Sequence, residues 1–185
     1  MADPSPPVPE LATERLRLRR LAIEDASGLH VAYGDADAMR FWDAAPSRDV
    51  GETQQRIGQS LSADTLWHAA WAVLGRCDDQ FIGMVNYHAR QMWNRRLAVG
   101  WILLPQFCGQ GYMQEAMPRV LDHCFDALQA HRIEAEIEPG NHRSLRLAER
   151  LGFRREGLLR DRLCVAGESR SIWMCALLRP EWSVP

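Results

Sequence analysis

The sequence of 185 residues predicts an α/β domain, an α+β mixed sheet flanked by helices. Three observations indicate this class. An almost continuously apolar run over residues 98–104 has the pattern of a strand covered on both faces. A glycine-rich turn and a long amphipathic helix over residues 111–129 follow it directly. Shorter segments of period-two alternation lie on both sides of this pair, so strands and helices are interspersed along the chain.

Composition and charge are those of a globular chain. Hydrophobic residues make up 46% and the formal charge is −2, which gives no general attraction to nucleic acid or to a membrane surface. No apolar run approaches the ~20 residues that span a bilayer. The five cysteines are scattered without metal-binding spacing, which predicts reduced thiols in a cytoplasmic protein and no metal. Residues 1–10 are proline-rich and lack the features of a secretory signal, so we expect a flexible tail before one domain over residues 11–185.

The first half of the chain predicts one strand, a layer of helices and three further strands. Leu16 and Leu18 alternate with arginines, which indicates a half-buried strand over residues 11–21. Helical segments are expected next, over residues 24–33, 35–41 and 49–62. Apolar runs separated by turn sequences then predict successive antiparallel strands over residues 67–74, 81–88 and 98–104.

The second half begins with the long helix, in which apolar residues recur at i, i+3, i+4 and i+7. Pro118 lies beyond its first turn, so we expect a bend there. A strand with one acidic face follows over residues 132–138. Asn141 suits the N-cap of the next helix, and Gly152 suits the position after its end. Two closing strands are expected over residues 153–162 and 171–178.

A series of segments carries a family resemblance. In chain order they are LATERLRLR, GQGYMQEA, HRIEAEIEPGNHRS, LAERLGFRREGLLRD and ALLRPEW. Together they resemble the GNAT superfamily of acyl-CoA-dependent N-acetyltransferases, and within it the ribosomal-protein alanine N-acetyltransferase (RimJ/RimL-like) branch. The resemblance covers essentially the whole folded chain. It implies a mostly antiparallel sheet that is splayed between its fourth and fifth strands, and acetyl-CoA as co-substrate.

The resemblance also implies where acetyl-CoA binds. The family's pyrophosphate loop corresponds here to Cys108, Gly109, Gln110, Gly111, Tyr112 and Met113. Of the three positions that define the family pattern, only Gly111 has the family's residue. Backbone N–H groups at a glycine turn and a helix N-terminus bind phosphate whatever the side chains are. The backbone of the fourth strand is expected to bind pantetheine and the acetyl oxygen through Trp101, Ile102, Leu103 and Leu104.

Proton transfer is expected from two further segments. Asn141 and Ser144 occupy the family's Asn-x-x-Ser positions and are implied to contact pantetheine, although Asn141 has a capping role in any case. Many relatives have a catalytic tyrosine where Ala148 stands, so Ser144 or an ordered water is the expected acid. Glu136 matches a catalytic glutamate of related enzymes and is the first candidate for the base. An ordinary ion-paired carboxylate is its alternative.

The acceptor side is expected to be aromatic. The substrate-binding candidates are Trp42, Trp71, Tyr87, His88 and Trp93, and burial in the core is the alternative for about half of them. His88 and Asp43 are further candidates for the base.

The expected reaction is acetylation of a protein or peptide N-terminal α-amine by direct attack in a ternary complex. An α-amine has a pKa of about 8, so only a modest base is required. Acetylation of a small amine (an antibiotic, toxin or polyamine) and acyl-CoA binding without turnover are the alternatives. We expect acetyl-CoA and an amine as partners and neither nucleic acid nor membrane, and leave a homodimer open.

Overall fold

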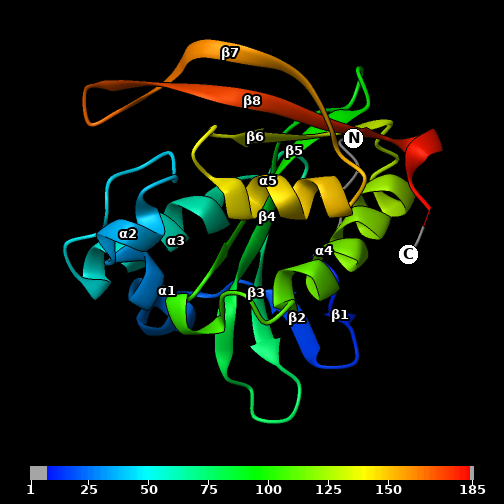
Figure 1. Ribbon diagram of the computed structural model, residues 1–185. Helices are drawn as coiled ribbons and strands as arrows, with labels where there is room; N and C mark the ends of the chain where they lie inside the picture. Colours follow the sequence, from blue (N-terminus) through cyan, green and yellow to red (C-terminus); the bar gives the residue numbers. More distant parts are fainter. Residues whose placement is uncertain (1–7, 184–185) are drawn as a thin grey trace.

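The computed structural model describes residues 8–183, which form an eight-stranded sheet with helices on both faces (Figure 1). The strands are β1 (Leu11–Ala12), β2 (Leu16–Arg20), β3 (Ala69–Gly75), β4 (Phe81–Gln91), β5 (Arg96–Leu103), β6 (Arg132–Ile137), β7 (Arg154–Val165) and β8 (Glu168–Leu178). The α-helices are α1 (Ala26–Tyr33), α2 (Ala36–Met39), α3 (Val50–Ser62), α4 (Tyr112–Asp122) and α5 (His142–Arg150). The strand order is β1-β2-β3-β4-β5-β6-β8-β7, and β5–β6 is the parallel pair in an otherwise antiparallel sheet of the described chain. This confirms the predicted mixed α/β class.

Two elements differ from the prediction. The single strand expected over residues 11–21 is a small hairpin, because the chain turns after Ala12 and β1 pairs antiparallel with β2. The long helix ends as an α-helix at Asp122 and continues as a π-helical turn, His123–Ala127. Pro118 lies inside α4, upstream of this irregular turn.

Helices cover both faces of the sheet, and each layer has its own core. Apolar side chains of α4 and α5 pack on one face, together with Leu16, Leu18 and Ile133. The other face is covered by α1, α2 and α3, which pack on residues such as Ala72 and Met84. Leu16 and Leu18 are both fully buried, as the period-two alternation predicts.

The parallel pair is short, and this determines the shape of the sheet. β5 pairs with β6 only at Arg96↔Arg132, Leu97↔Ile133 and Ala98↔Glu134. Beyond Ala98 the two strands separate. In Figure 1, β3 and β4 run down the view, whereas β6, β8 and β7 run across it. β5 and β6 are the fourth and fifth strands that the sequence predicts, so the predicted splay between them is confirmed.

The N-terminal segment is anchored earlier than expected. Residues 1–7 of the predicted tail lie outside the described residues. Val8 packs against the core, and the carbonyl of Pro9 accepts a hydrogen bond of 2.8 Å from the indole Nε1 of Trp71. None of the helices in residues 8–183 has the length and apolar character required to cross a membrane.

Candidate active site

The turn between β5 and α4 presents unpaired backbone N–H groups. Gly109 and Gly111 have φ of 81° and 80°, in the left-handed region that favours glycine, and Gly111 is the N-cap of α4. Within residues 8–183 the N–H groups of Gly109, Gln110 and Gly111 have no hydrogen-bond partner. The first-turn N–H groups of α4 point the same way and also lack helical partners. This arrangement suits the phosphate groups of a nucleotide cofactor.

Arg15, which the sequence reasoning missed, places a positive charge beside this turn. Its guanidinium lies 4.6 Å from the ring centroid of Tyr112 and donates to the Gln110 carbonyl at 3.3 and 3.4 Å. Its Nε is 2.6 Å from Oε2 of Glu115 on α4. The segment LATERLRLR contains Arg15, but no local pattern relates it to a carboxylate 100 positions away.

Glu115 connects the β1–β2 turn to α4. It accepts hydrogen bonds from the Thr13 hydroxyl and, at 2.8 Å, from the backbone N–H of Arg15. Burial alone would raise the pKa of Glu115, but these hydrogen bonds and the Arg15 charge outweigh it, so the pKa is lowered. The ionised carboxylate therefore fixes the first hairpin against the glycine turn.

Ser144 is held at the opening between β5 and β6. The indole Nε1 of Trp101 donates to Ser144 Oγ at 3.2 Å, and the Ser144 N–H donates to the Asn141 side chain at 3.2 Å. Asn141 thereby caps α5, as predicted. Because Ser144 Oγ accepts from Trp101, its own hydroxyl hydrogen is left to donate. The structure brings these three sequence-predicted residues together.

The opposite face of the splay carries a row of polar residues. In the sheet register, Asn86 is opposite Gly100 and His88 is opposite Ala98, which is in turn opposite Glu134. Residues paired in this way point to the same face of the sheet. The small residues Ala98 and Gly100 of β5 therefore lie between polar side chains of β4 and β6. Glu136, two residues beyond Glu134, lies on that face past the point of separation.

Two carboxylates influence His88 from other elements. Neighbouring groups desolvate the imidazole and lower the pKa of His88, although the residue remains exposed to solvent, while the charges of Asp43 and Glu136 act in the opposite sense. Glu136 also forms an ion pair with Arg162, with 3.2 Å between Oε1 and the guanidinium nitrogen. The predicted alternative for Glu136, a paired strand carboxylate, therefore describes part of its environment.

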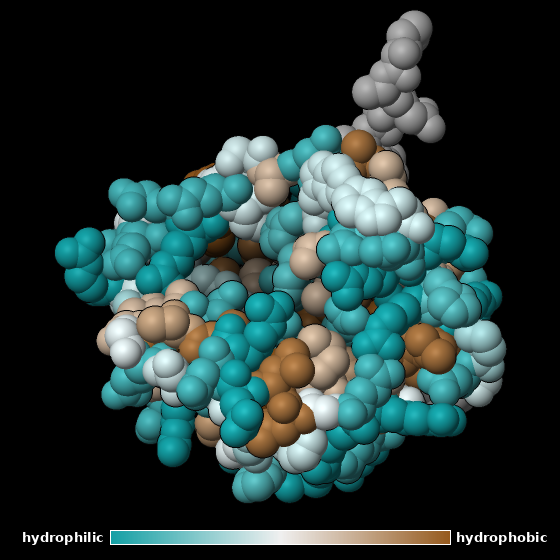
Figure 2. Space-filling view, turned by 90° about the horizontal axis from the view of Figure 1, so that it is seen from above, coloured by the Kyte–Doolittle hydropathy of each residue, from teal (hydrophilic) through white to brown (hydrophobic). Residues whose placement is uncertain are grey.

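The loop that carries Asp43 is hydrogen-bonded to β8. Arg170 donates to the carbonyl of Arg40 at 2.8 Å and forms an ion pair with Glu138 at 3.1 Å. Trp42, in the same loop, is half-buried and packs on Tyr33 with 5.9 Å between ring centroids. Seen from above, the surface is hollowed, with apolar side chains at the bottom, on the side where α2 and the β7–β8 turn lie (Figure 2).

Other predicted acceptor residues lie elsewhere. Trp71 is fully buried and Tyr87 is 2% exposed, both in the core beneath α4, so they cannot form the acceptor surface. The physical reason is strand alternation: they point to the face opposite His88. Trp93 is 73% exposed in the β4–β5 turn and forms an edge-to-face pair with Trp67, with 6.4 Å between the ring centroids.

Backbone groups of the predicted cofactor strand are partly engaged. Trp101, Ile102 and Leu103 lie on β5 beyond its last pair with β6. Leu104, however, donates its N–H to the Ile82 carbonyl at 3.0 Å, and its carbonyl accepts from Phe107 at 3.0 Å. Both backbone groups of Leu104 are therefore occupied within the protein, in contrast with the prediction.

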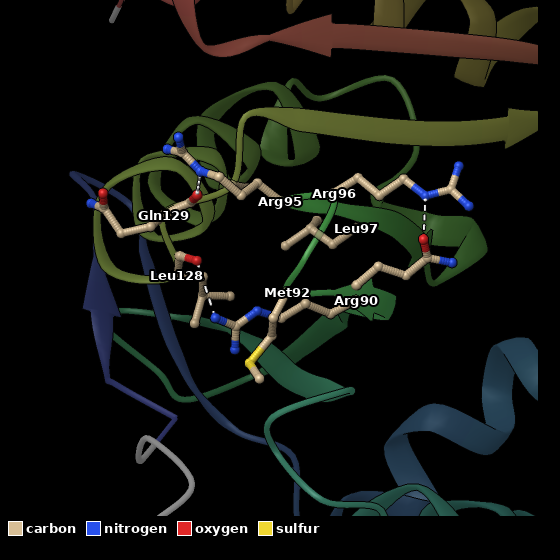
Figure 3. Close-up of a pocket in the computed structure, with 9 residues that line it drawn as sticks. Arg90, Met92, Arg95, Arg96, Leu97, Leu128 and Gln129 are labelled. Carbon is tan, nitrogen blue, oxygen red and sulfur yellow. Dashed lines mark hydrogen bonds between the residues drawn. The ribbon is translucent and has the colours of Figure 1, made fainter. Parts of the chain in front are cut away.

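A hollow of about 250 Å³ beside the β4–β5 turn lies away from these residues (Figure 3). Arg90 donates to the Leu128 carbonyl at 3.1 Å and Arg95 to the Gln129 carbonyl at 3.0 Å. Figure 3 shows that the Arg95 and Arg96 guanidinium groups point away from each other. The arginines therefore cap the carbonyls after the π-helical turn and do not converge on an anion.

Comparison with known proteins extends these observations. Residues 15–154 match the acetyltransferase (GNAT) domain. The uncharacterized N-acetyltransferase p20 of Bacillus licheniformis is 31% identical over 175 residues, covering 94% of this chain and 98% of the relative. The ribosomal protein uS5-alanine N-acetyltransferase of Escherichia coli is 28% identical over 185 residues, covering 96% and 94%. The spermidine N-acetyltransferase of Vibrio cholerae, solved with CoA and spermine, has a TM-score of 0.80 at 21% identity, covering 91% and 98%, a likeness of fold alone.

Proposed function

The chain belongs to the GNAT family of N-acetyltransferases, and from this premise we propose that it acetylates the N-terminal α-amine of a protein or peptide. Enzymes of this family use acetyl-CoA as co-substrate. The observation that carries the proposal is the separation of β5 from β6 beyond Ala98, with different functional groups on the two faces of the opening.

The described residues fit acetyl-CoA. The free N–H groups of Gly109, Gln110 and Gly111 are suited to pyrophosphate, and Arg15 adds a positive charge beside them. The β5 edge that faces the opening has backbone groups without ladder partners on β6, which suits the amide groups of pantetheine. Of the predicted strand residues, Trp101 and Leu103 keep this role. The backbone groups of Ile102 and Leu104 point instead to β4, where Ile102 is opposite Met84 and Leu104 donates to Ile82.

The two proton transfers of the reaction are proposed to take place on opposite faces of the opening. Bound acetyl-CoA supplies the thioester that the amine attacks. A backbone N–H near Leu103 is the proposed donor to the developing oxyanion. On the α5 face, Ser144 retains a hydroxyl hydrogen for the departing thiolate, directly or through water. On the other face, Glu136 is the proposed carboxylate to which the proton lost by the amine passes, with water as the last carrier.

The acceptor is proposed from the relatives and from charge. The alanine N-acetyltransferase similarity extends over nearly the full length of both chains, which supports a protein or peptide α-amine. A small polyamine is the second candidate, because the carboxylates of Asp43 and Glu136 lie on the acceptor face and attract cations. The shared fold with a spermidine acetyltransferase is compatible with that candidate.

The test is thiol release from acetyl-CoA with a panel of acceptors. The panel contains peptides beginning with alanine, serine or methionine, the same peptides with blocked N-termini, and spermidine and spermine. The proposal predicts turnover with free peptide α-amines above that with the polyamines. The reverse order would establish the second candidate. Thermal stabilisation by acetyl-CoA without turnover of any acceptor would identify a binding protein.

Variants test the catalytic assignments. Glu136→Gln and Ser144→Ala are each expected to lower kcat/KM at least about tenfold, since each removes a proton-transfer group. Glu138→Gln is the matched control for Glu136, because Glu138 is also ion-paired to an arginine at the same end of β6. A loss under about threefold in Glu136→Gln or Ser144→Ala would contradict its role.

A further inference from the structure

His88 and Asn86 form a hydrogen-bonded pair on the acceptor face of β4. His88 Nδ1 lies 3.2 Å from the side-chain oxygen of Asn86. An amide oxygen only accepts, so this contact assigns the hydrogen to Nδ1 and leaves Nε2 with a free lone pair. No residue in the described part of the chain is hydrogen-bonded to Nε2.

The pair lies where the sheet opens. His88 is opposite Ala98, the last residue of β5 that pairs with β6. Asn86 leans over β5, because a Cβ built on Gly100 would lie 2.9 Å from its side-chain oxygen. The β5 residues opposite the pair, Ala98 and Gly100, have a small side chain or none, so β5 itself places no large group against His88 and Asn86.

The surroundings keep His88 neutral near pH 7, although two carboxylates partly offset the effect of burial on its pKa. Burial lowers its pKa below the ordinary value, so the neutral imidazole dominates near pH 7. Asp43 from the loop after α2 and Glu136 from β6 contribute negative charge. His68, before β3, has its pKa lowered by burial and by His88, so it is neutral too. An imidazolium formed at His88 would therefore be stabilised by two carboxylates.

We propose that His88, positioned by Asn86, is the group that takes the proton directly from the acceptor amine, with Glu136 as the next stop for that proton through water. This inference rests on the proposed acetyl transfer. An ammonium acceptor gives one proton to Nε2 of His88 and becomes a nucleophilic amine. Its nitrogen then bonds to the acetyl carbon while the carbon–sulfur bond breaks and the electron pair stays on sulfur. The second nitrogen proton is lost as the thiolate is protonated, so the products are amide, CoA thiol and one released proton.

The pH dependence of kcat/KM tests this assignment. The assay uses acetyl-CoA with an alanine-initiated peptide, or with spermine if the peptide is not acetylated. His88→Gln is expected to lower kcat/KM at least about tenfold. It should also remove the acid limb, that is, the part of the fall in kcat/KM at low pH that comes from protonation of the enzyme and not of the acceptor. His131→Gln, at an exposed histidine between the π-helical turn and β6, is the matched control and should keep both rate and profile.

Asn86 is a positioning residue, and its variants give a different signature. Asn86→Ala should keep the acid limb but lower kcat, because His88 loses the partner that fixes its ring. Asn86→Asp keeps an accepting oxygen and adds a negative charge, which should move the limb to higher pH. Glu136→Gln should move it to lower pH. Thermal denaturation of each variant checks that the fold is retained.

Two failures are distinguishable. If the wild-type chain releases no thiol with any acceptor, the proposed function itself fails. If wild-type turnover is clear and His88→Gln keeps its rate within about threefold together with an unchanged acid limb, only the His88 assignment is overturned.

Discussion

Glu115→Gln is expected to destabilise the fold by disconnecting the first hairpin from α4. The carboxylate accepts from the Thr13 hydroxyl, the Arg15 N–H at 2.8 Å and Arg15 Nε at 2.6 Å. Hydrogen bonds to charged groups contribute about 1.5–3 kcal/mol each. The side chain of Glu115 is 20% exposed but that of Arg15 is 47% exposed, so solvent weakens the ion pair.

The magnitude follows from what glutamine retains. Its oxygen can still accept from Thr13 and from the Arg15 N–H, but its NH₂ group would face Arg15 Nε as a second donor. We therefore expect a loss of about 2 kcal/mol in the free energy of unfolding. For a chain of this size that corresponds to a fall in Tm of about 4–8 °C.

The assay is urea denaturation at pH 7 with wild type, Glu115→Gln, Arg15→Gln and the double variant. A coupling energy above about 1 kcal/mol is expected between the two sites. Asp126→Ala is the control, because Asp126 pairs with Arg179 at the surface and is 62% exposed. The reasoning is refuted if Glu115→Gln loses no more stability than Asp126→Ala, or if the two substitutions are additive.

Three further outcomes are expected. Gly111→Ala should cost about 1–2 kcal/mol of stability because of its φ of 80°, and should also raise the KM for acetyl-CoA. The control Gly167→Ala, with φ of 85° in the β7–β8 turn, should cost similar stability and leave the KM unchanged. Equal KM effects would contradict a role for Gly111 in binding. Trp71→Phe should lower the free energy of unfolding by about 1–3 kcal/mol, because the hydrogen bond to the Pro9 carbonyl is lost and a small cavity is left. Acceptor preference in the acceptor panel should be unchanged. A changed preference would show that Trp71 does contact the acceptor. Tm measured by calorimetry should fall as pH is lowered from about 7.5 to about 5.5. The reason is that histidines with a lowered pKa in the folded chain bind fewer protons there than the same residues at about 6.5 in the unfolded chain, and a flat profile would contradict those pKa shifts. These histidines are His68, His88 and His123.

Local features of the sequence predicted much of the fold. The alternation around Leu16 and Leu18 gave a buried strand face, since a strand repeats every two residues whatever it pairs with. Asn141 caps α5 and Gly152 has φ of 89° after that helix, because caps depend on residues a few positions apart. The glycine turn at residues 109–111 follows the same logic, and its positive φ values are a property of the turn itself.

Longer-range features were harder to obtain from sequence. The sequence predicts both Trp71 and His88 as acceptor residues, yet they point to opposite faces of the sheet. A pairing register that slips by one residue reverses which face a side chain occupies, and no pattern within a single strand states which helices cover that face. The family resemblance implies that the Leu104 backbone binds the cofactor, but its N–H donates to the carbonyl of Ile82 on the neighbouring strand.

By itself, the sequence determined the order of strands and helices, the glycine turn before α4 and, through whole-chain resemblance, the family. Only the tertiary structure decided that β5 and β6 part after Ala98, that Arg15 meets Glu115 beside the turn, and that Asn86 holds His88 at the opening. Local conformation depends on neighbours along the chain, which the sequence displays directly. The meeting of Arg15 with Glu115 depends on how β-strands and helices pack across 100 positions, and packing is settled by the whole molecule at once.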